Sequence, residues 1–420
     1  MENAAYFPKK TGMVYLMIKE KLTEFCEKNF SRYLKILEEM VSTNSFTDNK
    51  DGVNKLGAYT ADLFAPLGFL SEFVSSINPS YGNHLICVKE GKGRGSVALV
   101  SHLDTVFSPE EEEKYNFRFK VVDDRVYGPG TCDIKGGTLV MYMMLEALKE
   151  NIPEFYDSIS WYLLFDASEE TGSADFGALC AKVLPQDAAA ALVFEAGALM
   201  LDKVHLVTSR KGRAVFRIES VGRGAHAGTS HQDGVNAITK LCKAVLSMAK
   251  LTDYSKSITV NTGIIKGGSG LNRVPENAYA DIEMRAFYPD LFSETIGKIK
   301  SFAHRDEVSE LKVQLIQAAL PWPENPRSIF LKNVWGKAAE KMNLKAESVR
   351  RGGLSDGNFL WNILPVIDAL GPTGSNAHCS ERADDGSRDQ EFAVLSSFVP
   401  KAVLNMLGII QLFDKTDESN

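Results

Sequence analysis

The chain has 420 residues, of which 44% are hydrophobic and 24% are charged, and its formal net charge is −7 at pH 7. This length exceeds what one hydrophobic core usually fills, so two domains are expected, and the acidic balance disfavours nucleic acid or an anionic membrane surface as a partner. The first residues lack the apolar core of a secretory signal, and no later stretch approaches the roughly 20 uninterrupted apolar residues of a membrane span. We therefore expect a cytoplasmic protein.

Helices and strands alternate over the first half of the chain. The spacing of apolar residues predicts helices at about 13–41 and 55–66. Strand-like runs follow at 84–90, 96–100, 158–165 and 189–194. The last three runs are almost continuously apolar, which is typical of strands buried on both faces, and an amphipathic run over 136–150 predicts a helix between two of them. This order predicts an α/β domain whose sheet is covered by helices on both sides.

The pattern changes after residue 208. Alternating strands and two amphipathic helices follow in the order βαββαβ, which suits a one-layer sheet closed by two helices. Three prolines in 318–326 then break regular structure and return the chain to an α/β pattern. We predict a discontinuous main domain over 1–208 and 322–420, with a small domain inserted at 209–321. The acidic run at 110–114 is expected to be a solvated loop.

The six cysteines are spread over nearly the whole chain without C-x-x-C pairs, so a disulfide scaffold is not expected. Most are expected to be small buried side chains. Cys132 and Cys379 lie next to residues singled out below, but a thiolate nucleophile would need a nearby base, so this alternative is disfavoured.

Polar side chains follow each apolar strand of the main domain at the point where it ends. Because ligands of open α/β sheets bind outside the carboxyl ends of the strands, these side chains are expected to converge. They are His102 and Asp104 after the first strand, Glu169 and Glu170 after the second, and Glu195 after the third, with Asp133 and His378 from two further segments.

Each of these residues alone has an ordinary structural explanation. An isolated His102 is more often a hydrogen-bonded core histidine, Asp133 alone more often caps a helix, and adjacent glutamates more often lie on a solvated face. Glu195 is harder to explain in this way, because an unpaired carboxylate at the edge of the core costs several kcal/mol. Together, these histidines and acids form a nitrogen and oxygen ligand set suited to zinc, cobalt or manganese, and bound cations would let the carboxylates tolerate one another.

Several motifs, taken in order, resemble those of the co-catalytic zinc amidohydrolases that include glutamate carboxypeptidase, acetylornithine deacetylase and succinyl-diaminopimelate desuccinylase. They are SHLDTV, GPGTCDIKGG, EETGS, VFEAG, GAHAG and GGSGLNRVPENAYADIEMR. The resemblance covers nearly the whole chain after about residue 30 and is closest to the glutamate carboxypeptidase branch. It implies a phosphorylase/hydrolase-like three-layer αβα catalytic domain with an inserted ferredoxin-like βαββαβ dimerisation or lid domain.

The resemblance also implies two divalent metal ions, zinc in the first place, with cobalt or manganese as alternatives. His102 and Glu195 would hold one ion, Glu170 and His378 would hold the other, and Asp133 would bridge the pair. One carboxylate can span the roughly 3.5–4 Å between such ions.

Catalytic roles follow from the same resemblance. Asp104 would accept the second ring N–H of His102 and fix the orientation of that imidazole. Glu169 would be the general base that activates a metal-bridging water for attack on an amide carbonyl and then protonates the leaving amine. His226 would reach the active site of a partner subunit and help to hold the oxyanion, which implies a homodimer formed through the inserted domain. Without the resemblance, His226 is equally well explained as a surface histidine.

The substrate is expected to carry a free carboxylate. By resemblance, Asn272 and Arg285 would bind it, and Gly352 and Gly353 could offer backbone groups, although Arg285 alone would be explained as an exposed strand residue. The return crossing at 318–326 carries no second arginine for an acidic side chain, so glutamate specificity is not expected.

The predicted function is hydrolysis of an amide or peptide bond next to a free α-carboxylate, as in a carboxypeptidase or an N-acyl-amino-acid hydrolase. One alternative is a biosynthetic deacylase that acts on an acetylated or succinylated amine. Another is a catalytically silent binding protein, which is disfavoured because the base and the ligands are all present. A dinucleotide-binding protein is also disfavoured, because no G-x-G-x-x-G lies between a strand and a helix.

Overall fold

The computed structural model describes residues 12–307 and 309–414, so the first residues considered for a secretory signal lie partly outside the described residues. The chain forms two compact units. The first unit runs to Thr208 and continues over Glu324–Val349 and from Ser355 onward. The second unit comprises Ser209–Pro323 and Arg350–Leu354.

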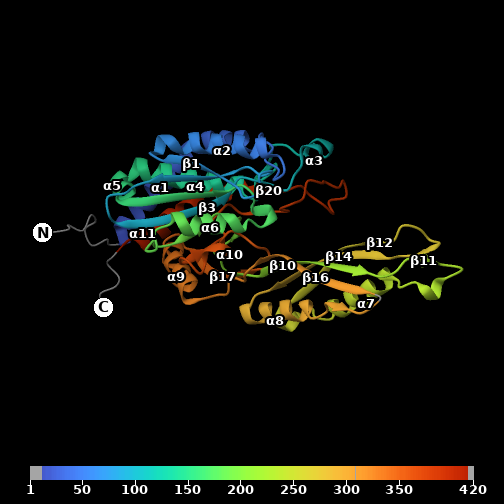
Figure 1. The fold of residues 1–420 in the computed structure, drawn as a ribbon. Helices are drawn as coiled ribbons and strands as arrows, with labels where there is room; N and C mark the ends of the chain where they lie inside the picture. Colours follow the sequence, from blue (N-terminus) through green and yellow to red (C-terminus); the bar gives the residue numbers. More distant parts are fainter. Residues whose placement is uncertain (1–11, 308, 415–420) are drawn as a thin grey trace. The chain divides into compact units, whose positions relative to one another are not determined.

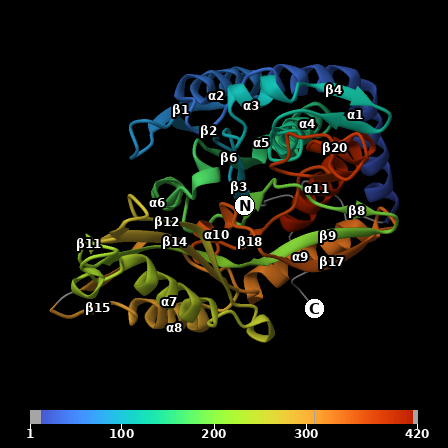
Figure 2. The ribbon, with the colours of Figure 1, turned by 90° about the vertical axis from the view of Figure 1, so that its right-hand side faces the viewer.

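A six-stranded mixed sheet forms the centre of the first unit (Figure 1, Figure 2). Its strands lie in the order β1 (Leu70–Ser75), β2 (Asn83–Lys89), β6 (Ile159–Asp166), β3 (Gly95–His102), β7 (Ala191–Val193) and β18 (Val366–Ile367). The last four run parallel to one another, whereas β1 and β2 are antiparallel to their neighbours. The predicted strands are confirmed to within a few residues, and β3 is buried along all but its first residue.

Helices lie on both sides of this sheet. In Figure 1, α2 (Lys50–Phe64) is on one side of the strands and α6 (Ala174–Val183) is on the other. The predicted helix over 136–150 is α4 (Lys135–Asn151), which packs on β3, on α1 (Gly12–Val41) and on α11 (Phe398–Leu412). The sequence predicts that α4 is buried on one face only. The structure differs, because β3 covers one side of α4 while α1 and α11 cover other sides, so that α4 is buried all round.

The run Leu395–Leu412, most of which is α11, is long and apolar enough to cross a bilayer by length and composition. It is 67% buried within the protein, where α11 packs against α4 and α9 (Pro326–Glu340). Buried helices in the core of a globular unit can have the same length and apolar composition as a membrane span, so the packing of α11 explains its apolar character.

Gly408 of α11 lies so close to α9 that only glycine fits. A Cβ at this position would lie 2.5 Å from Trp335 Cε2. Because overpacking a filled core costs about 1–3 kcal/mol, we expect Gly408→Ala to lower the free energy of unfolding by about that amount, as measured by urea denaturation. Gly336→Ala on α9, where the nearest atom would be 3.9 Å away, is the control. Wild-type stability of Gly408→Ala would contradict this packing.

A small four-stranded sheet in the first unit joins two segments that are far apart in sequence. Its order is β19 (Gly374–Ser375), β20 (Phe392–Val394), β5 (Arg125–Tyr127) and β4 (Lys120–Val122). This pairing sets the segment after β5, which contains Asp133, beside the segment between β19 and β20, which contains His378. Other elements of this unit are α5 (Pro153–Ser158), α10 (Gly357–Leu360) and β8 (Leu199–Met200). The strands β9 (Lys203–Arg210) and β17 (Lys345–Arg351) begin in the first unit and end in the second.

The acidic run expected to be a loop is a helix, α3 (Pro109–Lys114). Its N-cap Ser108 accepts a hydrogen bond from the Glu111 N–H, and Pro109 occupies the first helical turn. Glutamates in that turn interact favourably with the positive end of the helix dipole. The prediction was wrong because it counted charge and overlooked the cap.

The second unit is an antiparallel sheet with helices on one face. Its strands lie in the order β12 (Thr259–Gly267), β14 (Asn277–Ala286), β10 (Gly212–Val221), β16 (Glu310–Ala319) and the short β15 (His304–Arg305). The helices are α7 (Ala237–Ala249) and α8 (Pro289–Lys300). Buried Phe216 and Ile282 pack in the core on the helix side, and charged Arg217 and Glu283 alternate with them along β10 and β14.

Candidate metal centre

Three parallel strands of the first unit end at the same edge of the sheet. His102 is the last residue of β3 and pairs in register with Asp166, the last residue of β6. A single 3-10 turn after β6 carries Glu169 and Glu170, and Glu195 follows β7. The parallel pairing therefore collects side chains from segments that are far apart in the sequence.

Asp133 lies between two imidazoles, each facing a different carboxylate oxygen. His102 Nε2 is 3.2 Å from Asp133 Oδ1 and 3.8 Å from Glu195 Oε1. His378 Nε2 is 3.3 Å from Asp133 Oδ2 and 3.0 Å from Glu170 Oε2. The structure thus brings all the residues expected as ligands together, in two groups that share Asp133.

The donor set fits divalent cations. Ligand atoms of His102, Asp133 and Glu170 all lie within 4.8 Å of one another. Glu170 Oε1 is buried and has no hydrogen-bond partner among the described residues, which is costly for a carboxylate oxygen unless a cation contacts it. Imidazole nitrogens and carboxylate oxygens are ligands for zinc, cobalt and manganese.

Burial and neighbouring charged groups shift the pKa values of the residues at this site. Burial, followed by the charge of Asp133, raises the pKa of Glu170 to about 7. Hydrogen bonds to Asp133 and Glu170 raise the pKa of His378 to about 11. Burial lowers the pKa of His102, but hydrogen bonds to Asp104 and Asp133 outweigh it and leave that pKa well above its usual value. The acids are close enough that cations would relieve their repulsion.

Glu169 lies beside this group. Burial raises the pKa of Glu169 well above its usual value, and the charges of Glu195 and Glu170 add to the effect while His102 opposes it. A carboxyl group with a raised pKa can both take and return a proton near neutral pH, which a general base in amide hydrolysis must do.

Asp104 is buried and makes more contacts than the expected one to the imidazole. His102 Nδ1 lies 3.0 Å from the backbone oxygen of Asp104 and 3.3 Å from its Oδ1. The same carboxylate accepts the backbone N–H of Glu169 at 3.1 Å and of Glu170 at 3.3 Å, and the hydroxyl of Thr47 at 2.7 Å. One side chain therefore orients an imidazole and the turn that carries both glutamates.

Residues 98–400 match the family model described as peptidase family M20/M25/M40. The chain belongs to this family. It is a hydrolase that acts on peptide or amide bonds, which confirms the resemblance inferred from the motifs. Metallopeptidases of the M20 family use metal ions, and the group around Asp133 is the candidate place for them.

Similarity to individual proteins is consistent with membership of this family. The chain is 28% identical over 358 residues to carboxypeptidase G2 from Pseudomonas sp. (strain RS-16), which covers 84% of each protein. It is 28% identical over 263 residues to an acetylornithine deacetylase from Vibrio cholerae, which covers 58% of this chain and 65% of the relative. The fold is similar to that of a tripeptidase from Staphylococcus aureus, with a TM-score of 0.72 at 23% identity over 91% of this chain and 98% of the other.

Other residues expected to act in the M20 reaction lie in the second unit. The Nδ1 atom of His226 accepts the N–H groups of Gly228 and Thr229, both at 3.1 Å. The ring hydrogen of a neutral His226 is therefore on Nε2, and the side chain is exposed. The backbone oxygen of Asn272 accepts the N–H of Ala227 at 2.9 Å, so Asn272 lies beside His226.

The guanidinium group of Arg285 already donates hydrogen bonds to other residues of the second unit. Its Nε donates to Glu283 Oε1 at 2.6 Å, and its Nη1 donates to the Gly352 oxygen at 2.9 Å. The Gly353 oxygen accepts Arg210 Nη1 at 3.2 Å. The structure thus sets Arg285 beside the expected glycine segment, and a carboxylate ligand would share the guanidinium with Glu283.

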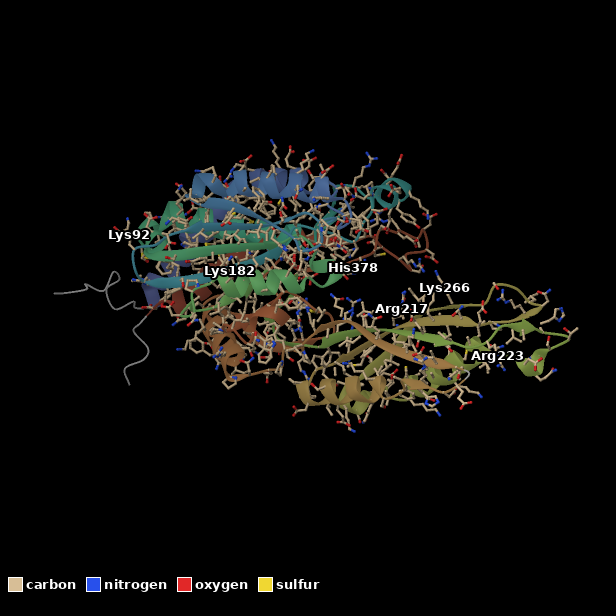
Figure 3. All side chains as sticks on the ribbon, in the orientation of Figure 1. Lys92, Lys182, Arg217, Arg223, Lys266 and His378 are labelled. Atoms are coloured by element: carbon tan, nitrogen blue, oxygen red, sulfur yellow. The ribbon has the colours of Figure 1, made fainter. Side chains whose placement is uncertain are left out.

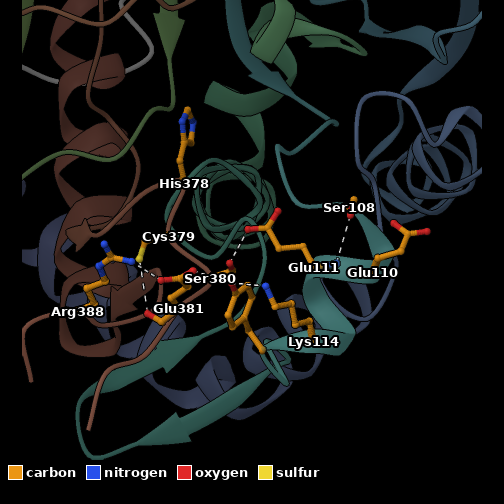
Figure 4. A pocket seen from close by; sticks show the side chains of 10 residues that line it. Ser108, Glu110, Glu111, Lys114, His378, Cys379, Ser380, Glu381 and Arg388 are labelled. Atoms are coloured by element: carbon orange, nitrogen blue, oxygen red, sulfur yellow. Dashed lines mark hydrogen bonds and ion pairs between the residues drawn. The ribbon is translucent and has the colours of Figure 1, made fainter. Parts of the chain in front are cut away.

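A cavity of about 620 Å³, lined by polar and charged residues, opens beside the candidate ligand His378 (Figure 4). Figure 3 labels His378 in the view of the whole chain. Its lining comprises Ser108, Glu110, Glu111, Lys114, Tyr115, His378, Cys379, Ser380, Glu381 and Arg388. Glu381 accepts the Tyr115 hydroxyl at 2.6 Å and pairs with Arg388. Cys379 is half-buried and Cys132 is buried, and both are free thiols.

Sequence reasoning missed Glu391 at this site. Its Oε1 accepts the N–H groups of Cys132 at 3.0 Å and Asp133 at 3.2 Å, and its Oε2 accepts the N–H of His378 at 3.4 Å. The sequence does contain one indication of this contact. Glu391 stands directly before the apolar residues of β20, so its side chain starts at the edge of the core.

Proposed function

We propose that this M20 hydrolase is a dinuclear metal enzyme, with zinc as the first candidate, that cleaves an amide or peptide bond next to a free α-carboxylate. The observation that carries this proposal is the position of Asp133, whose two oxygens face His102 on one side and His378 on the other. His102 and Glu195 would hold one ion, Glu170 and His378 the other, and Asp133 both. Bound cations supply Lewis acidity, which lowers the pKa of a water and polarises the scissile carbonyl.

Residues of the chain itself would transfer the protons of the reaction and stabilise the negative charge that develops on the substrate oxygen. Glu169 takes the proton of the attacking water and passes it to the leaving amine, for which its raised pKa is suited. The Nε2–H of His226, contributed by a second copy of the chain, donates a hydrogen bond to the developing oxyanion. Asn272 and Arg285 bind the substrate carboxylate, with Gly352 and Gly353 alongside. This assignment makes the enzyme a homodimer joined through its inserted domain, and we place it in the cytoplasm.

Metal analysis combined with a substrate panel tests the proposed function. Protein dialysed against zinc is expected to retain two equivalents per chain and to hydrolyse short peptides or N-acyl amino acids that have a free α-carboxylate. The same compounds with an amidated carboxyl group are the matched controls and should react poorly. Faster turnover of acetylated or succinylated amines would favour a biosynthetic deacylase, which the similarity to acetylornithine deacetylase keeps as the second candidate. A metal-replete protein that is inert on the whole panel would contradict both.

Metal binding is expected to release protons. Hydrogen bonds to Asp133 and Glu170 raise the pKa of His378 to about 11, so this imidazole holds a proton at pH 8 until a cation displaces it. Because ligation requires a neutral imidazole, adding zinc should release the proton of His378, and the apparent affinity should rise with pH as this proton becomes easier to displace. Titration in a weakly buffered indicator measures the release. His378→Ala should release about one proton fewer, and equal release by both proteins would contradict the assignment.

A further inference from the structure

Glu391 is a buried carboxylate that joins two loops of the first unit. Its residue is 0% exposed and stands immediately before β20. All three backbone N–H groups that its side chain accepts belong to Cys132, Asp133 and His378. Two of these residues are candidate metal ligands from different segments, and the third precedes one of them.

The loop that carries His378 has a sharply bent backbone that Glu391 contacts. His378 has a φ of 66° and Asn376 has a φ of 60°, a left-handed conformation that is uncommon outside glycine and that Asn and His adopt more readily than other residues. The N–H of Glu391 donates to the Cys379 oxygen at 2.7 Å, and the N–H of Cys379 donates to the Asn376 oxygen at 2.9 Å. Glu391 therefore holds this loop through both its backbone and its side chain.

The loop that carries Asp133 is packed directly against the segment before His378. A Cβ on Gly374 would lie 2.5 Å from Cys132 Sγ, so the two loops touch at a point where only glycine fits. At this contact the Glu391 carboxylate supplies an acceptor to both loops at once. A displacement of either loop would break a hydrogen bond to a buried carboxyl group, and leaving a buried polar group unpaired is costly.

A buried carboxylate beside other acids needs a reason to be retained. Burial, followed by the charges of Asp133 and Glu170, raises the pKa of Glu391 to about 8, and hydrogen bonds from the N–H groups of Cys132 and Asp133 oppose that rise. A neutral side chain of similar size would avoid the desolvation cost but could not accept N–H groups with both of its terminal atoms. Only a carboxyl side chain places one acceptor oxygen against the loop of Asp133 and a second acceptor oxygen against the loop of His378.

We propose that Glu391 is a positioning residue of the metal centre, which holds the backbones of Asp133 and His378 at the separation that metal binding requires. This inference rests on the proposed dinuclear site. Glu391 contacts no bound cation or substrate in this role, since it acts through the two ligands whose backbones it holds.

The test is a titration of chelator-treated protein with Co²⁺ alone, followed by its visible absorption, for wild type and Glu391→Gln. Glutamine can still accept the N–H groups of Cys132 and Asp133, but its amide nitrogen then faces the His378 N–H, which releases that loop. We expect one of two Co²⁺ equivalents to bind about 10–100-fold more weakly, with a changed spectrum for that equivalent. Turnover should recover when Co²⁺ is added in excess.

Glu146→Gln is the matched control. Glu146 accepts hydrogen bonds from Tyr33 and Tyr142 and pairs with Arg32, away from the candidate ligands, so its variant should bind both equivalents as wild type does. If Glu391→Gln unfolds more easily than the control, both proteins are compared by the rise in melting temperature that Co²⁺ produces. Combining Glu391→Gln with His378→Ala should add little further loss for the weaker equivalent, because both changes act on the same ion.

Wild-type affinity of Glu391→Gln for both equivalents would overturn the positioning role while leaving the proposed function intact. Fully additive losses in the combined variant would overturn it as well. A wild-type protein that binds no Co²⁺ would instead contradict the proposed metal centre, and the inference about Glu391 would fall with it.

Discussion

Replacing Glu169 with glutamine is expected to leave the metals in place and to lower kcat by about 10²–10⁴-fold, the usual contribution of a general base. Glutamine has the same shape but cannot take a proton. The backbone N–H of residue 169 would still donate to Asp104, so the turn that carries Glu170 should keep its position. Metal content by elemental analysis and turnover on a peptide substrate measure the two quantities separately.

The control for this variant is Glu154→Gln, the same chemical change at an exposed position on α5. It should have wild-type turnover and metal content. Retained turnover in Glu169→Gln would remove Glu169 from the role of base. Loss of metal together with turnover would instead show that Glu169 is a ligand.

If the proposed dinuclear centre is right, Asp104→Ala is expected to weaken the binding of both metals by about 10–100-fold each, the range for partners that orient metal ligands. The effect should extend to both ions because Asp104 contacts His102 on one side and accepts the N–H of Glu170 on the other. It also accepts the N–H of Glu169, so kcat at saturating metal should fall as well. Competition with a chelator of known affinity measures the first effect, and steady-state kinetics in excess zinc measure the second.

Thr47→Val is the control for Asp104→Ala. It removes only the hydroxyl that donates to Asp104 Oδ2 and leaves the other contacts of the carboxylate in place. Its effect should therefore be a small fraction of that of Asp104→Ala. If Asp104→Ala behaved as wild type, Asp104 would simply cap a turn.

The convergence of the candidate ligands could be predicted because it follows from strand direction. If 96–100, 158–165 and 189–194 are parallel strands, their carboxyl ends meet at one edge, and His102, Glu170 and Glu195 do lie at one edge of the sheet. Asp133 and His378 come from two further segments, and since neither stands at the end of a strand of this sheet, their specific ligand roles follow only from the motif resemblance.

The contacts that could not be predicted depend on how loops are bent. Asp104 was expected to contact His102 because the two are close in sequence, but its bonds to the N–H groups of Glu169 and Glu170 depend on the turn after β6. In the same way, Glu391 and Asp133 are 258 residues apart, and no local pattern relates them.

The second unit shows the same limit. The order βαββαβ is visible in the spacing of apolar residues, whereas the engagement of Arg285 by Glu283 depends on side-chain conformation. The motif resemblance marks Arg285 as a candidate carboxylate binder but does not reveal that the carboxylate of Glu283 already contacts it.

The interruption of the first unit by the second has a consequence for how the protein is made. Glu170 and His378 belong to one unit, yet the whole of Ser209–Pro323 is synthesised between them. A chain emerging from the ribosome therefore presents His102, Asp133, Glu170 and Glu195 well before the residue that completes the second group. Contacts between residues so distant in sequence form slowly. Metal loading of the proposed centre would therefore have to wait until the segment after Pro323 has been synthesised and has folded onto the first unit.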